Sequence, residues 1–185
     1  MKINSIKNVP GLLLLLFIAF SALSFTEPKE WQLFESKECG FKINFPGQAA
    51  HTTQPIQTAA CELKLEIFQL DISANSSNHN AVYMVNYSVL PDSINSSRTD
   101  KMEAFFKGSI NGMATNVKGT VLSTKVISYK GYPGRIARVD MQGQAIITAE
   151  LILVNNKYYM IMAMTTPAKE PNTDITKFFD SFQTL

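Results

Sequence analysis

The sequence is poor in the side chains from which catalytic and metal sites are usually built. It has two histidines, His51 and His79, and neither has a second metal ligand two to four positions away. A zinc site would therefore need ligands from distant segments. No Gly-x-Ser-x-Gly pattern marks a serine nucleophile. We predict no catalytic, cofactor or metal site, and we expect that the protein is not an enzyme.

An excess of one charge is also missing. The chain has 17 lysines and arginines against 15 aspartates and glutamates, and two of the lysines, Lys2 and Lys7, precede the first apolar run. Without the N-terminal segment that contains these two lysines, 15 basic residues balance the 15 acidic ones. A nucleic-acid-binding domain usually presents a strongly basic face. We therefore expect no nucleic-acid partner.

A hydrophobic run long enough to span a membrane is absent as well. The apolar run at residues 11–25 is shorter than the ~20 residues that a spanning helix needs, and it follows two lysines, which is the pattern of a secretory signal peptide. Small residues permit cleavage after Ser24 or after Ser21. We predict a signal peptide over residues 1–24 and one exported domain over residues 25–185. The location is then periplasmic or extracellular, with no stable membrane span after cleavage.

The exported part contains a series of strand patterns. Apolar and polar residues alternate in FKINF and CELKLEI, at residues 41–45 and 61–67, which predicts half-exposed strands. AVYMVNYSVL follows at residues 81–90, and four further strands with turns between them occupy residues 120–165. In KYYMIMAM, at residues 157–164, both alternating sets are apolar, so both faces of the sheet should be covered.

Two segments have the apolar spacing of helices instead. One runs from Met102 to Val117, and the other ends the chain with Ile175, Phe178 and Phe182 on one side. We predict an α+β fold in which a central antiparallel sheet of about six to eight strands is flanked by helices.

Three methionines, Met160, Met162 and Met164, share one face of a predicted strand. Thioethers can bind copper(I), but no cysteine or histidine is adjacent to complete a site. Because methionine fills irregular cores readily, we expect these side chains to be core residues.

The order of these segments resembles a known family. The quoted stretches are GFKINFPGQ, VNYSVLP, a helix, GYPGRIARVDMQGQ, ELILVNNKYYMIMAM and FFDSF. They are similar to exported or lumenal PsbP/Mog-type domains and to uncharacterised secreted bacterial proteins of that type, over nearly all of residues 25–185. The resemblance implies a PsbP/Mog-like α/β/α sandwich and a non-enzymatic accessory or binding role. No ligand motif, and hence no functional residue, carries over.

The two cysteines, Cys39 and Cys61, are a candidate disulfide because an exported pair meets an oxidising compartment. If the first two strands form a hairpin with Phe45 opposite Cys61, Cys39 is too far away for a bridge. If Phe41 instead lies opposite Ala59, the two cysteines face each other. A bridge and two buried free thiols both stay open at this stage.

The segment YKGYPGRIARV, at residues 129–139, combines turn-forming and basic residues. Pro133 and Gly134 suit the middle of a type II turn, and strand patterns flank them, so we predict a hairpin and not a phosphate site at the start of a helix. The candidate surface for an anionic partner consists of Lys125, Lys130, Arg135 and Arg138. Pairing with acidic residues in the N-terminal third of the same domain is the alternative.

Two functional classes fit these patterns. The first is an exported, non-catalytic accessory or binding protein of the cell envelope, whose partner is an unknown protein or envelope component. The second is a small-ligand carrier or hydrolase with a site assembled from scattered residues. A deep cavity holding a histidine beside a serine or carboxylate would favour the second class, and a filled core with a shallow groove would favour the first.

Overall fold

The computed structural model describes residues 30–57, 62–75 and 78–185, so the predicted signal peptide lies outside the described residues. Within these residues the chain forms ten strands, two α-helices and one short 3-10 helix. No helix in these three stretches is both long and apolar enough to cross a bilayer.

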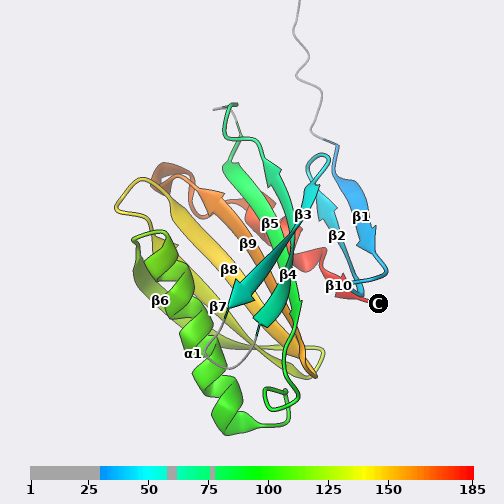
Figure 1. The fold of residues 1–185 in the computed structure, drawn as a ribbon. Helices are drawn as coiled ribbons and strands as arrows, with labels where there is room; N and C mark the ends of the chain where they lie inside the picture. Colours follow the sequence, from blue (N-terminus) through cyan, green and yellow to red (C-terminus); the bar gives the residue numbers. More distant parts are fainter. Residues whose placement is uncertain (1–29, 58–61, 76–77) are drawn as a thin grey trace, which may run out of the picture.

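Seven strands form one antiparallel sheet (Figure 1). Their order across the sheet is β3, β4, β5, β9, β8, β7 and β6. Their bounds are Ala50–Gln57 (β3), Glu62–Asp71 (β4), Asn80–Val89 (β5), Thr120–Tyr129 (β6), Tyr132–Asp140 (β7), Ile146–Val154 (β8) and Lys157–Thr165 (β9). Strands β6 to β9 pair consecutively, which confirms the meander that the turn signals predicted.

A second, smaller sheet consists of β1 (Gln32–Ser36), β2 (Phe41–Phe45) and β10 (Gln183–Thr184), with β2 in the middle. Both strand registers considered for the disulfide placed the β2 segment beside the strand that contains CELKLEI, and neither forms: β2 pairs with β1 and β10, and β4 pairs with β3 and β5. The reason is burial. Phe41, Ile43 and Phe45 are completely buried because the small sheet packs on the face of the large sheet and does not extend it.

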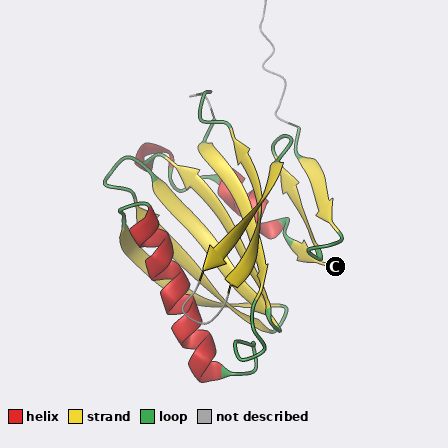
Figure 2. Ribbon diagram, viewed as in Figure 1, coloured by secondary structure: helices red, strands yellow, loops and turns green. Residues whose placement is uncertain are grey.

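The two faces of the large sheet are covered by different elements (Figure 2). Helix α1 (Thr99–Asn116) covers one face, and the small sheet with helix α2 (Thr173–Asp180) covers the other. Strand β9 shows the division, because Tyr159 and Ile161 belong to the core under the small sheet, whereas Met160 and Met162 pack with the core under α1. The structure thus confirms an α+β fold with a central antiparallel sheet covered on both sides.

The hairpin between β6 and β7 forms as predicted, but its turn lies elsewhere. Lys130 and Gly131 occupy the turn with φ angles of 49° and 87°. Two consecutive residues with positive φ match the right-handed twist of the flanking strands in a two-residue hairpin. Pro133 and Gly134 belong to β7, where they pair with Ser128 and Ile127.

Helix α2 docks by the apolar side that the sequence predicted. The side chain of Asn172 caps its first turn by accepting a hydrogen bond from the Ile175 backbone N–H at 3.1 Å. Phe178 is completely buried, and Phe182 is buried just beyond the end of the helix. The 3-10 helix η1 (Pro167–Lys169) leads from β9 towards α2.

Candidate ligand-binding cavity

A cavity of about 670 Å³ lies between α1 and the large sheet. Helix α1 contacts β6 and β7, so a wedge stays open between the helix and β4, β5 and β9. Small-molecule sites in proteins typically have volumes of about 300–1,000 Å³. Residues from six elements line the wedge: Ile56 of β3, Leu63 and Leu65 of β4, Met84, Asn86 and Ser88 of β5, Ile147 of β8, Tyr158, Met160 and Met162 of β9, and Phe105, Gly108, Ser109, Gly112, Met113 and Asn116 of α1.

Two glycines of α1 keep the mouth of this cavity open. Gly108 and Gly112 are four residues apart, so they lie on the same side of the helix. A Cβ atom at either position would meet no atom within 4 Å. Glycine in a helix interior costs stability relative to alanine. The helix therefore has two weak helix formers at positions where a larger side chain would have room.

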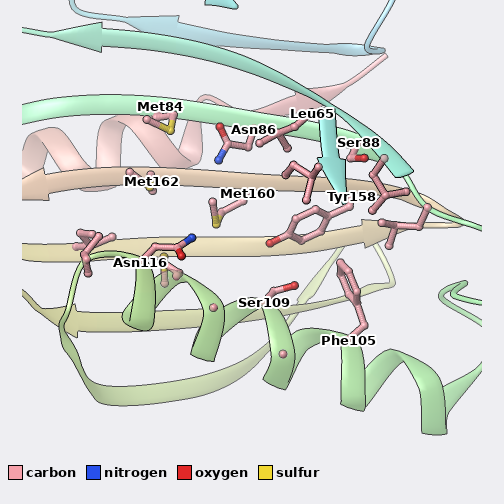
Figure 3. A pocket seen from close by; sticks show the side chains of 18 residues that line it. Leu65, Met84, Asn86, Ser88, Phe105, Ser109, Asn116, Tyr158, Met160 and Met162 are labelled. Carbon is pink, nitrogen blue, oxygen red and sulfur yellow. The ribbon is translucent and has the colours of Figure 1, made fainter. Parts of the chain in front are cut away.

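The floor of the cavity is made by facing pairs on β5 and β9. Met84 lies opposite Met162, Asn86 opposite Met160, and Ser88 opposite Tyr158. Figure 3 shows the methionines and Asn86 on the sheet side of the cavity, with Ser109 and Asn116 of α1 on the other side. Methionine side chains are flexible and polarisable, so a wall built from them adapts to the shape of a ligand.

Two polar groups in this wall have no hydrogen-bond partner. Asn86 is 7% exposed and Ser88 is 3% exposed. Asn86 Oδ1 and Ser88 Oγ are the two side-chain polar atoms, among the described residues, that are buried without a partner. A buried polar atom left unpaired usually has a functional reason, such as a site for a water or a ligand.

Tyr158 supplies a further polar group at the cavity, and its environment is apolar. Its hydroxyl bonds to the Ser109 side chain, and burial raises its pKa well above the ordinary value of 10. Phe105 packs edge-on against its ring, with 4.9 Å between the ring centroids. Tyr158 therefore stays a neutral phenol at physiological pH, which suits binding and not proton transfer.

The lining has no group suited to acid–base or nucleophilic chemistry. Among the described residues, none of those that line the cavity is charged or is a histidine. Ser88 and Ser109 thus have no base beside them. No cluster of three or more His, Cys, Asp or Glu side chains in the described stretches could hold a metal ion. What the cavity can do chemically is enclose an apolar molecule and hydrogen-bond its polar end.

The four basic residues of the candidate anionic-partner surface do not share one surface. Lys125 and Lys130 are exposed. Arg135 is buried, forms an ion pair with Glu103 of α1 and stacks on the Phe106 ring at 5.0 Å. Its side chain therefore lies under α1.

Arg138 lies on the opposite face of the sheet. It donates two hydrogen bonds to Glu170, of 3.0 and 2.6 Å, and Thr148 donates a third at 3.1 Å. Both arginines therefore pair with acidic residues of their own domain, which was the alternative to a partner-binding surface. Their partners come from α1 and from the segment after η1, and not from the N-terminal third.

Cys39 is a buried free thiol, and Cys61 lies outside the described residues. Burial raises the pKa of the Cys39 thiol above its ordinary value. Neither strand register considered for the bridge forms, because β2 and β4 belong to different sheets. The backbone carbonyl of Cys39 accepts a hydrogen bond of 2.9 Å from the Tyr159 hydroxyl, which joins the small sheet to β9.

Strand β4 is less exposed than its alternation of polar and apolar residues suggests, because its polar side chains form a network. Glu66 is buried and accepts hydrogen bonds from Lys64 at 2.6 Å, from Thr53 at 2.7 Å and from His51 at 2.8 Å. The Lys64 and Thr53 hydrogen bonds lower the pKa of Glu66 to about 2. The His51 ring stacks on Phe68 with 4.4 Å between centroids. This network holds β3 to β4, and it lies away from the cavity.

The residues of this cavity were not predicted from the sequence, although the sequence contains weak signals for them. Met84, Asn86 and Ser88 alternate on β5, and their polar members look like a solvent face. Gly108 and Gly112 look like defects in a helix pattern. Only the placement of α1 over this face of the sheet shows that both features meet at one cavity.

The layers and strand order described above define a PsbP-like fold. The solution structure of cyanobacterial PsbP (CyanoP) from Synechocystis superposes with a TM-score of 0.54 over 90% of this chain and 99% of that one, at 8% sequence identity. A protein of unknown function from Pseudomonas aeruginosa, described as a putative regulator, superposes with a TM-score of 0.33 over 78% of this chain and 89% of its own, at 12% identity. The sequence matches no protein-family model and no curated protein. The fold is therefore shared with cyanobacterial PsbP at only 8% identity, and function has to be argued from the site.

Proposed function

We propose that the protein is an exported, non-catalytic binding protein that carries a small apolar molecule in the cavity between α1 and the large sheet. One observation carries this proposal: a cavity of about 670 Å³ has a methionine-rich wall in which two buried polar atoms lack partners. The absence of a histidine or a charged group from the described lining favours a carrier over a hydrolase. Export follows from the leader pattern at residues 1–24.

A binding titration tests the carrier function. The probe is N-phenyl-1-naphthylamine, an uncharged molecule that fluoresces more strongly in apolar surroundings. We expect saturable binding to the protein and at least tenfold weaker binding, about 1.4 kcal/mol, to Gly112→Leu, whose new side chain enters the mouth of the cavity.

The matched control is Asn111→Leu, which adds the same side chain one position away, in the separate hollow between α1 and β6. This variant should bind the probe as the unchanged protein does. If the protein fails to bind the probe, or if both variants bind equally well, the carrier proposal is wrong. Intact-mass analysis of the native protein tests export separately, since the mature chain should begin near Phe25 or Ala22.

A further inference from the structure

The residues that line the cavity indicate the charge of the ligand that it can bind. An ionised head group buried without an opposite charge loses its hydration and gains no partner. Among the described lining residues none is a lysine, arginine, aspartate or glutamate. The basic side chains considered above are elsewhere, because Arg135 is paired with Glu103 and Arg138 lies under the other face. The lining therefore disfavours a carboxylate or an ammonium group.

The two unpartnered oxygens, Asn86 Oδ1 and Ser88 Oγ, indicate what the polar end of the ligand looks like. Asn86 and Ser88 are two residues apart on β5, so they lie on the same face of the sheet, with their Cα atoms about 7 Å apart along the strand. A hydrogen bond spans about 2.8 Å between heavy atoms. One ligand oxygen does not bridge the two residues comfortably, whereas two polar atoms on neighbouring carbon atoms do.

The nature of the two atoms restricts the ligand further. A carbonyl oxygen such as Asn86 Oδ1 only accepts a hydrogen bond, so the ligand has to donate one to it. The Ser88 hydroxyl both donates and accepts, so it takes either kind of polar atom. A vicinal diol meets both requirements. The methionines Met84, Met160 and Met162 extend from these groups along the same wall and provide the apolar surface for a hydrocarbon chain.

We propose that the ligand is an uncharged amphiphile that bears two neighbouring hydroxyl groups on an apolar chain, with its diol at Asn86 and Ser88 and its chain along the methionine wall. This inference rests on the proposed carrier function. It names the chemical class that the cavity selects, and it makes Asn86 and Ser88 the residues that determine specificity.

Displacement of bound N-phenyl-1-naphthylamine by three ten-carbon competitors tests the proposal at pH 8. The competitors are decane-1,2-diol, 1-decanol and decanoate, which share a chain and differ in the polar end. We expect the diol to displace the probe at a concentration about tenfold below that of decanoate and several-fold below that of 1-decanol, since each satisfied hydrogen bond adds a few-fold in affinity.

Two variants test whether the preference for the diol depends on Asn86 and Ser88. In Asn86→Leu and Ser88→Ala, with each competitor compared with the probe affinity of the same variant, the diol and 1-decanol should come to within about threefold of each other, because each variant removes one hydrogen-bond partner. A protein in which decanoate competes as well as the diol, or in which both variants keep the full diol preference, would overturn this inference and leave the carrier function standing.

Two other outcomes would contradict the carrier function itself. In one, the protein does not bind the probe; in the other, Gly112→Leu leaves probe binding unchanged. Native mass spectrometry adds one more distinction, because a dimer that excludes the probe would assign the cavity to a second copy of the chain and would overturn both proposals.

Discussion

Asn86 lies directly opposite Met160 on the neighbouring strands β5 and β9, and its Oδ1 has no hydrogen-bond partner. The thioether of methionine is at best a weak acceptor, so it cannot satisfy a carbonyl oxygen. Six positions earlier on the same strand, Asn80 is also buried, but its side chain has partners, since it donates to the Tyr83 hydroxyl at 2.8 Å and to Asn172 at 3.1 Å. One strand thus holds a structural asparagine and an asparagine that the fold does not use.

The two asparagines should respond oppositely to one substitution. Asn86→Leu removes an unpaired polar atom from an apolar wall, and we expect the free energy of unfolding to rise by about 1–2 kcal/mol. Asn80→Leu removes three hydrogen bonds, one to Tyr83 and two shared with Asn172, so it should lower that free energy by about 1–3 kcal/mol. Urea denaturation measures both, and a loss of stability in Asn86→Leu would contradict the assignment of this side chain to binding.

The helix glycines at the cavity mouth should be replaceable without strain. Gly108→Ala and Gly112→Ala should each raise stability by about 0.8–1 kcal/mol, because the new methyl groups meet open space and alanine favours the helix. For a domain of this size such a gain corresponds to a shift of about 2–4 °C in the thermal midpoint.

Gly119 and Gly134 provide the contrast. A Cβ atom would lie 2.5 Å from the Asp140 carbonyl oxygen at Gly119 and 2.8 Å from the Leu151 carbonyl oxygen at Gly134. Alanine at either position should lower the thermal midpoint, since backbone would have to move. If all four alanine variants melted alike, the open space at the cavity mouth would not be real.

Glu150 should give the protein a pH-dependent stability near pH 5. Burial, with a smaller contribution from Asp180, raises its pKa from 4.5 to about 6. A carboxyl that holds its proton more tightly when folded stabilises the fold fully below pH 4.5, and this contribution is lost as the pH rises through about 6. The free energy of unfolding should therefore fall by up to about 2 kcal/mol across this window, and Glu150→Gln should flatten that slope in urea titrations at several pH values.

Glu66 is the control for this experiment because its pKa is shifted the other way. Its pKa of about 2 means that it stabilises the fold above pH 4.5 and loses this contribution as the pH falls towards 2. Glu66→Gln should accordingly change acid unfolding below pH 4.5 and leave the slope between pH 4.5 and 6 unchanged. A slope near pH 5 that both variants share would assign the titration to other groups.

The docking side of α2 should be essential for folding, and its solvent side should not. Phe178 is completely buried against Phe45 and Tyr83, so Phe178→Ala should cost about 3–5 kcal/mol. Asp174 forms a half-exposed hydrogen bond of 3.1 Å with the His79 ring, and Asp174→Ala should cost about 1 kcal/mol or less. Thermal unfolding distinguishes the two, and an unchanged midpoint in Phe178→Ala would show that this face is not part of the core.

Several features of the fold could be predicted from local pattern. The double apolar alternation of Tyr158 to Met164 indicated a sheet covered on both faces, and the stripe of Ile175 and Phe178 indicated a docking helix, because both patterns depend only on the period of the backbone. The structure confirms each of them. The resemblance to PsbP-type domains led to the same fold class, which the match to cyanobacterial PsbP confirms.

Pairing between distant segments could not be predicted in this way. The partners of Phe41 to Phe45 are Gln32 to Ser36 and the last residues of the chain, and nothing in the alternation of a short strand specifies which edge it joins. The pairing of Arg135 with Glu103 and of Arg138 with Glu170 similarly depends on which face of β7 each side chain occupies once α1 and the segment after η1 have docked.

The sequence by itself therefore determined both α-helices, most of the strands of the large sheet, most of the core, and the lack of a recognisable catalytic motif; it did not show β1, β3 or β10. The candidate site was decided only by tertiary structure. Asn86 and Ser88 on a strand, and Gly108 and Gly112 on a helix, have no relation within the sequence, and each pair alone looks like an ordinary surface feature. They form one cavity because α1 packs against β6 and β7 and stands away from β4, β5 and β9. The physical reason is that local periodicity sets which way a side chain points, whereas the packing of distant elements sets what it meets.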